Sequence, residues 1–304
     1  MDPGVSLTTV LRDWGRIGCL GFGGPPVHIT MLRELCVKQR GWIDDERFEH
    51  GITATGLLPG PSSTQLAIYC AWVIAGVRGA IVGGLAFILP GLVMIIGLAA
   101  LMLGDSPAWI KGAGAGAAAA VPVVAVHAAG HLVGPSIARA LTTDARVRWC
   151  LYLAAGLAAA ALAGPWLVLV LIGAGLLELA IVRPHRRLSA LVPWPAVIGG
   201  VASGAGLGAL SWTAFKVGAL SYGGGFVIVP LMQHDAVDRY GWLTDADFAS
   251  AVALGQVTPG PVVHTVAAVG YGAHGLGGAL LAAAVAFLPS FWFIAIGATR
   301  FEEL

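Results

Sequence analysis

A long stretch of this sequence occurs twice, and the two copies align without a gap. The first copy covers residues 18–61 and the second covers residues 218–261, a separation of 200 positions. The identical positions are mostly glycine, proline and tryptophan, which shape the backbone or lie at membrane interfaces. A fixed-period match of this length indicates an internal duplication. We therefore expect each half of the chain to build the same backbone shape.

The composition places much of the chain in lipid. Hydrophobic residues make up 57% of the sequence and charged residues only 11%, against about 25% charged residues in typical soluble domains. The net charge of +1 gives no electrostatic reason to expect a nucleic-acid partner. These values predict a polytopic membrane protein whose apolar surface is solvated by membrane lipid.

Each copy ends in a Pro-Gly-Pro motif that interrupts an apolar segment. In residues 51–77 the motif leaves two pieces, each shorter than the roughly 20 residues that span a bilayer. Two half-length helices joined at such a tip predict a re-entrant hairpin, and residues 249–275 predict a second one. Backbone of this kind is tolerated at membrane depth only where protein or water covers it. Broken helices at matching places in two repeats favour a transporter whose substrate binds at the tips.

Uninterrupted apolar segments predict ordinary spanning helices in the rest of the chain. These segments are 79–103 (with a kink at Pro90), 112–133 and 277–297, with two shorter runs at 149–163 and 166–182. We divide the chain into a first transporter repeat, residues 1–190, and a second repeat, residues 191–304. The second repeat is C-terminally incomplete relative to the first, because residues 112–182 have no counterpart in it.

The charges of the two polar loops predict that the repeats have opposite orientations. The loop of the first copy holds four basic residues (Arg33, Lys38, Arg40 and Arg47), whereas the equivalent loop holds only Arg239. Lysine and arginine favour the cytoplasmic side of a membrane, so the two loops are expected on opposite sides. The expected fold is therefore an all-α, inverted-repeat helical transporter with broken, re-entrant helices.

The duplicated motifs resemble those of the chromate ion transporter family. The similar segments are RIGCLGFGGP (16–25), GWIDDERF (41–48) and LLPGPSSTQLA (57–67), with KVGALSYGGG (216–225), GWLTDADF (241–248) and TPGP (258–261) in the second half. The resemblance implies two homologous halves of opposite orientation in the inner membrane. It also implies export of chromate from the cytoplasm, with chromate resistance as the result and sulfate as a structural mimic.

Chromate is a tetrahedral dianion, and its binding within a membrane requires positive charge and fixed N–H or O–H donors. Arg16 and Lys216 supply charge at equivalent positions, and a basic residue in an apolar segment is a functional hypothesis. The alternative is that both side chains extend to the membrane interface.

Backbone N–H groups and hydroxyls supply the expected donors. Glycine allows close approach to an anion, and a helix that begins after a tip directs its partial positive charge there. The alternative is that glycine and proline only shape the breaks. The candidate substrate-binding residues are Arg16, Gly23, Gly24, Pro59, Gly60, Pro61, Ser62, Ser63, Lys216, Gly223, Gly224, Pro259, Gly260, Pro261 and His264.

Other polar residues are more simply explained by structure. Asp45 and Asp245 are expected to cap the helices that enter the hairpins. Glu178 is expected to pair with Arg183 at the membrane edge. His127 and His131 are spaced as a metal pair, but no third ligand is evident. No metal, no cofactor and no enzymatic activity are expected, since the sequence lacks a nucleotide-binding loop or a catalytic triad spacing.

Two alternatives to chromate export remain open at the level of sequence. One is transport of sulfate or another small oxyanion, because a site for a tetrahedral dianion separates isosteres poorly. The other is a non-transporting membrane protein, motivated by the helices that the second repeat lacks. The sequence also leaves open the coupling ion and whether the chain forms a homo-oligomer.

Overall fold

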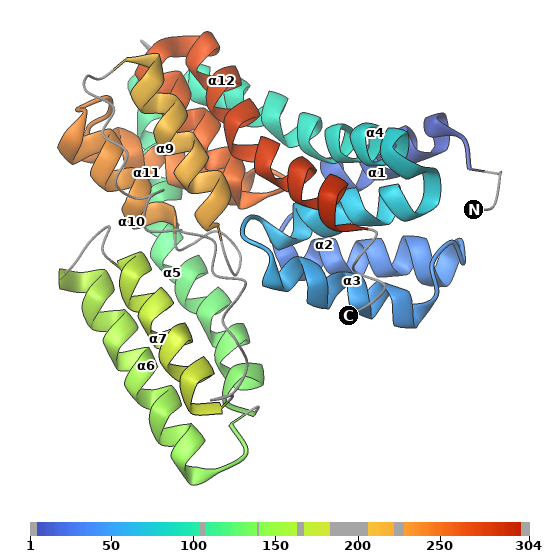
Figure 1. Ribbon diagram of the computed structural model, residues 1–304. Helices are drawn as coiled ribbons and strands as arrows, with labels where there is room; N and C mark the ends of the chain where they lie inside the picture. Colours follow the sequence, from blue (N-terminus) through green and yellow to red (C-terminus); the bar gives the residue numbers. More distant parts are fainter. Residues whose placement is uncertain are drawn as a thin grey trace. The chain divides into compact units, whose positions relative to one another are not determined.

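The computed structural model describes residues 5–103, 107–138, 140–162, 167–182, 206–221 and 228–298. Every regular element in these ranges is a helix (Figure 1), which confirms the all-α prediction. The chain divides into two compact units, one comprising Met1–Ala119 and Ala202–Leu304 and the other Ala120–Val201. Elements of both repeats therefore share the first unit. The expected repeat boundary at residues 190 and 191 lies outside the described residues.

The two copies form the same succession of helices. The first gives α1 (Leu7–Leu20), α2 (Pro25–Arg33), the π-helix η1 (Glu34–Gln39), α3 (Asp45–Leu57) and α4 (Ser62–Met102). The second gives α9 (Leu207–Leu220), α10 (Ile228–Gln233), the π-helix η3 (His234–Arg239), α11 (Asp245–Val257), the 3₁₀ turn η4 (Val262–His264) and α12 (Thr265–Gly297). Both hairpins are thus interrupted at their Pro-Gly-Pro motifs, as predicted.

The polar loops repeat in their backbone hydrogen bonds as well. The N–H of Trp42 donates to the carbonyl of Cys36 at 2.8 Å, and the N–H of Trp242 donates to the carbonyl of Ala236 at the same distance. The helix caps are Asp44 and Thr244, whose side chains accept from the backbone N–H three residues later. The prediction that Asp45 and Asp245 are caps was therefore wrong by one position, since these residues begin α3 and α11.

Two long helices form the centre of the first unit. α1 packs along α4, α9 packs along α12, and α4 and α12 pack against each other. Both long helices are kinked, at Ala75–Gly76 and at His274–Gly275, and both kink glycines have a φ of 61°. The backbone of α4 stays helical at Pro90, so the kink expected there is instead at Gly76.

Two segments in the described ranges, Ser62–Met102 and Val262–Gly297, are long and apolar enough to cross a membrane. Each one contains the second arm of a hairpin, the kink, and then a spanning stretch. The kinks are 199 residues apart whereas the tips are 200 apart, so the second copy is one residue shorter between tip and kink.

The second compact unit contains most of α5 (Ala108–Ala138) together with α6 (Thr143–Leu162) and α7 (Leu167–Val182). α6 and α7 pack side by side and share a polar cluster. In this cluster Glu178 accepts hydrogen bonds from Arg148, at 2.9 and 3.1 Å, and from the Tyr152 hydroxyl at 2.9 Å. Glu178 is therefore paired with Arg148, while Arg183 lies outside the described residues.

Candidate functional site

The two Pro-Gly-Pro tips meet at one small pocket in the first unit. Residues that line it include Pro61, Ser62 and Ser63 of the first repeat and Ser221, Pro261 and Val262 of the second. Residues about 200 positions apart in the sequence thus share one site. The pocket leaves about 10 Å³ for the centre of a water molecule, which is about the minimum that holds one water. A tetrahedral oxyanion is larger, so the tips must separate to admit it.

Each tip contacts the opposite repeat. The N–H of Gly260 donates to the carbonyl oxygen of Gly21 at 2.9 Å. At the other tip, Gly60 has a φ of 115°, and a Cβ placed on it would lie 3.2 Å from the carbonyl oxygen of Gly218. Only glycine combines this backbone conformation with so close an approach. The motif therefore allows the tips to pack against backbone, where larger residues would hold them apart.

His28 links the two tips through hydrogen bonds. Its side chain is fully buried, with Nδ1 at 3.2 Å from the Ser63 hydroxyl and Nε2 at 2.9 Å from the Gly21 carbonyl oxygen. Because the Gly21 carbonyl also accepts from Gly260, a continuous path joins Ser63 at the first tip to Gly260 at the second. A Cβ on Gly21 would lie 2.7 Å from the imidazole, so a larger residue there would displace His28.

Several buried polar atoms near the tips have no hydrogen-bond partner among the described residues. They are Thr64 Oγ1, Gln65 Oε1, Ser221 Oγ and Ser290 Oγ. Buried polar groups in folded proteins are nearly always hydrogen-bonded, so a cluster of exceptions requires an explanation. Among these residues Ser221 lines the pocket between the tips, so a polar ligand that enters there would supply the partner that its hydroxyl lacks.

The start of α4 adds backbone donors to this cluster. α4 begins at Ser62, directly after the first tip, and its N-cap residue is Pro61, which makes no side-chain hydrogen bond to the first N–H groups. The first turn of a helix exposes unpaired N–H groups and carries partial positive charge, both of which favour an anion. Together with the hydroxyls of Ser62 and Ser63, the pocket presents donors suited to the oxygens of an oxyanion.

The two predicted basic residues do not line this pocket in the part of the chain that the structure describes. Arg16 is exposed on α1. Lys216 is buried on α9 and forms an ion pair with Asp235 of η3, with Nζ and Oδ2 2.5 Å apart. The Thr213 hydroxyl donates to the same carboxylate oxygen at 2.7 Å. The charge of Lys216 is therefore compensated by a residue that the sequence did not single out.

Of the two glycine pairs predicted to bind substrate, the structure describes only the first. Gly23 and Gly24 precede α2 with φ values of 107° and 74°, so glycine is required there for backbone shape. Gly223 and Gly224 lie outside the described residues.

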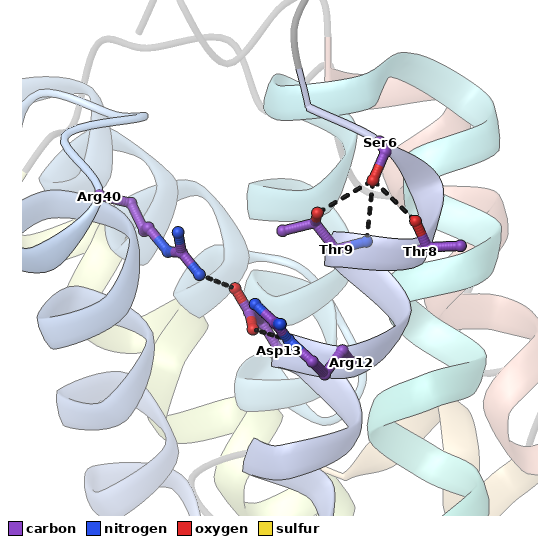
Figure 2. A network of polar contacts seen from close by, with 6 residues as sticks. All are labelled: Ser6, Thr8, Thr9, Arg12, Asp13 and Arg40. Carbon is purple, nitrogen blue, oxygen red and sulfur yellow. Dashed lines mark hydrogen bonds and ion pairs between the residues drawn. The ribbon is translucent and has the colours of Figure 1, made fainter.

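The first repeat has an ionic contact of its own between its first helix and its polar loop. Asp13 on α1 lies between two arginines, at 3.1 Å from Arg12 and 3.0 Å from Arg40 (Figure 2). Figure 2 also shows Ser6 capping α1 through its bond to the N–H of Thr9. Asp13 occupies the position of Thr213 in the second repeat, so both repeats join these two elements, but only the second does so with a fully buried pair.

The polar stretch of the first repeat holds a further ion cluster. Arg33 pairs with Asp45 at 2.7 Å and also with Glu49. The hydrogen bond to Glu49 is the main reason that the pKa of Arg33 is raised, with the nearby negative charges adding to it. This cluster ties α2 to α3 at the base of the hairpin, away from the tip.

Sequence reasoning missed two residues of the site: His28, which hydrogen-bonds to Ser63, and Ser221, which lines the pocket. One signal was available for His28, which lies in an apolar segment where the second copy has Ile228. No comparable signal marked Ser221, because serine is common at helix ends. Within the described ranges no group of three or more side chains could hold a metal ion.

A search with protein-family models matches this chain to the family described as Chromate transporter, over residues 8–179 and 208–304. The Chromate transport protein of Cupriavidus metallidurans is 31% identical over 99% of this chain and 76% of its own length. The Chromate transport protein of Pseudomonas aeruginosa is 30% identical over all of this chain and 76% of its own length. The Probable chromate transport protein of Synechococcus elongatus is 29% identical, again over the whole chain and 78% of its own length. No solved structure matches significantly.

Proposed function

This chain belongs to the chromate transporter family of membrane proteins, and from that premise we propose that it exports chromate from the cytoplasm across the inner membrane and confers chromate resistance. The observation that carries the proposal is the meeting of the two Pro-Gly-Pro tips at one pocket to which Ser62, Ser63 and Ser221 contribute hydroxyls. A pocket shared by two repeats is where a secondary transporter binds its substrate.

The substrate would be held by the donors at the tips. The hydroxyls of Ser62 and Ser63 and the first N–H groups of α4 surround one side, and His264 and Ser221 bring buried polar atoms from the second repeat. Neutral donors at fixed positions can replace the hydration shell of an oxyanion without placing a permanent charge in the membrane.

The alternating step would be a movement of the repeats against each other. With the polar loops on opposite sides of the membrane, each hairpin would reach the pocket from its own side. Export of a dianion from a negatively charged cytoplasm is favoured by roughly 2.3 kcal/mol per charge for each 100 mV of membrane potential. The membrane potential alone could therefore drive export.

Lys216 and Arg16 would act at a distance from the pocket. Lys216 is on α9, which also carries Gly218 and ends directly before Ser221, so a change in its pairing would alter the potential at the tips. Arg16 is exposed on α1 and is proposed to attract the anion before it enters.

A second substrate, sulfate, is favoured by the chemistry of the same pocket. Hydroxyl and N–H donors recognise four tetrahedrally arranged oxygens and not the central atom, so sulfate should compete with chromate. A competition assay in which excess sulfate leaves chromate transport unchanged would restrict the site to chromate.

The direct test follows chromate accumulation in chromate-sensitive cells that express this chain. We expect lower accumulation and higher resistance than in cells with an empty vector. Ser63→Ala should reduce export by about tenfold, since it removes a donor from a desolvated oxyanion. Ser250→Ala is the matched control, because the Ser250 hydroxyl donates to the Ala246 carbonyl within α11 itself.

Unchanged accumulation in cells that contain the wild-type protein in their membrane would overturn the export proposal. Binding of chromate by the purified protein under those conditions would then support the non-transporting alternative.

A further inference from the structure

The imidazole of His28 is held in one orientation at the centre of the site. It is fully buried on α2, its ring meets the edge of Phe87 at a centroid distance of 5.0 Å, and both ring nitrogens have partners. A buried histidine in a fixed orientation beside a substrate pocket is suited to exchange protons.

The partners of His28 determine its tautomer. The Gly21 carbonyl oxygen can only accept, so Nε2 must carry a hydrogen and donate to it. In the neutral ring, Nδ1 is then an acceptor, and the Ser63 hydroxyl must donate to it. Neutral His28 therefore engages the hydrogen of Ser63, and the hydroxyl presents only lone pairs to the pocket.

Protonation of His28 reverses this arrangement. Nδ1 then carries a hydrogen and donates to the Ser63 oxygen, and the hydroxyl hydrogen turns toward the pocket, where it can donate to a substrate oxygen. We propose that His28 is the proton-binding site of the transport cycle. When His28 is neutral, the Ser63 hydroxyl presents only its acceptor lone pairs to the anion, and when His28 is protonated, the same hydroxyl donates a hydrogen bond to the anion. This inference rests on the proposed function, since it concerns the same pocket.

The charges around His28 make the oxyanion its natural counter-ion. The titratable residues on the elements that pack around it are Arg12, Asp13, Arg16 and Cys19 of α1, Arg33 of α2, Glu34, Cys36 and Lys38 of η1, Tyr69, Cys70 and Arg78 of α4, His264 of η4, and Tyr271 and His274 of α12. Asp13 and Glu34 are the carboxylates on these elements among the described residues; two arginines already pair with Asp13, and Lys38 pairs with Glu34. A bound dianion would therefore supply the negative charge that a protonated His28 requires.

Proton binding and oxyanion binding are then cooperative. Each partner strengthens the binding of the other by the same factor, so oxyanion affinity should rise as pH falls. The proton and the dianion leave together when the pocket opens to the other side, and each cycle carries one net negative charge.

The test is calorimetric titration of the purified full-length protein in buffers of different ionisation enthalpy. The dependence of the measured heat on the buffer gives the number of protons taken up per anion bound. Both chromate and sulfate serve as ligands, because sulfate remains a dianion throughout the pH range and reports only the proton taken up by the protein.

We expect wild-type protein to take up close to one proton per anion, and its affinity to fall by about tenfold per pH unit at alkaline pH, as one linked proton requires. His28→Gln should bind the anion without proton uptake, and its affinity should change by less than about twofold per pH unit. His50→Gln, at an exposed histidine of α3, is the matched control and should behave as wild type.

Further variants keep the test decisive if His28→Gln fails to fold. Ser63→Ala should lose most of the pH dependence although His28 is intact, and Ser63→Thr, which retains a hydroxyl, should restore it. The proposal would be overturned if His28→Gln retained proton uptake, including the case in which His264→Gln lost it and His28→Gln did not. Tight binding by the wild type without proton uptake would also overturn it while leaving the transport function standing, whereas absence of any binding would count against that function itself.

Discussion

The ion pair between Lys216 and Asp235 is buried in the interior of the first unit. Both side chains are almost inaccessible to solvent, and Thr213 completes the hydrogen bonding of the carboxylate. Removal of one partner leaves an uncompensated buried charge, which costs more than removal of both. The pair therefore lends itself to a comparison of single and double variants.

We expect Lys216→Met and Asp235→Asn each to destabilise the protein by about 3–5 kcal/mol. The double variant should recover most of that loss, because no isolated charge remains. Thermal unfolding in detergent measures the difference. Arg40→Met, which breaks the more exposed contact with Asp13, should cost about 1 kcal/mol or less. A loss in the double variant equal to the sum of the two single losses would show that Lys216 and Asp235 act independently.

For single residues, the sequence identified which side chains belong to the candidate site better than it identified the partners that those side chains contact. The serines that follow the first tip do line the pocket, because their place is fixed by the adjacent Pro-Gly-Pro motif. Lys216 was recognised as a functional candidate, but Asp235 lies 19 residues away in a polar loop, and only the packing of η3 on α9 brings them together. Such tertiary pairings leave no local signal in one sequence.

At the scale of helices, the kinks of α4 and α12 separate each hairpin arm from the spanning stretch that follows. Both kinks depend on a glycine with a φ of 61°, a conformation that costs other residues roughly 1–2 kcal/mol. The hairpins were predictable because proline and glycine interrupt them in both copies. The kinks were not, because Gly76 and Gly275 stand among many other glycines that are helical, whereas Pro90 was the more visible helix breaker.

Gly76→Ala should therefore destabilise the protein by about 1–2 kcal/mol, and Gly275→Ala by a similar amount. A Cβ at either position would meet no atom within 4 Å, so the loss comes from the backbone alone. Gly97→Ala is the matched control, since Gly97 lies in open space within the helical part of α4 and should gain up to about 1 kcal/mol. Denaturation midpoints that are equal for the Gly76 and Gly97 variants would contradict the kink assignment.

At the scale of the whole molecule, the proposed transport depends on contact between the tips. Ser62 and Val262 line the same pocket from opposite repeats, so cysteines at both positions should form a disulfide. The variant is made after replacement of Cys19, Cys36, Cys70 and Cys150. For the cross-linking assay, a specific protease site is introduced between residues 183 and 205, and oxidation should keep the two halves joined after cleavage. For the transport assay, oxidation should stop transport until a reductant is added.

The control for this cross-link combines Ser62→Cys with Ser250→Cys, a residue on α11 that does not line the pocket among the described residues. Cross-linking of the control pair with equal efficiency, or full transport by the oxidised tip variant, would remove the basis for alternating access at the tips.

The orientation of the repeats has a separate test. Lys38 and Asp238 are exposed in the equivalent π-helices η1 and η3, and the loop charges predict that they face opposite sides of the membrane. With cysteine at each position in turn, a membrane-impermeant maleimide should label residue 238 in intact cells and residue 38 only after the membrane is opened. Labelling of both from one side would contradict the inverted arrangement.

The bond from Gly260 to Gly21 and the contact of Gly60 with Gly218 have a consequence for how such a protein could arise. The tip of each repeat lies against backbone of the other repeat, so half of the chain cannot close this pocket by itself. An ancestor of half the length would have needed to form a homodimer. Fusion of the two genes would then have allowed each tip to change independently, and the histidines near the tips, His28 and His264, are indeed at different positions in the two copies.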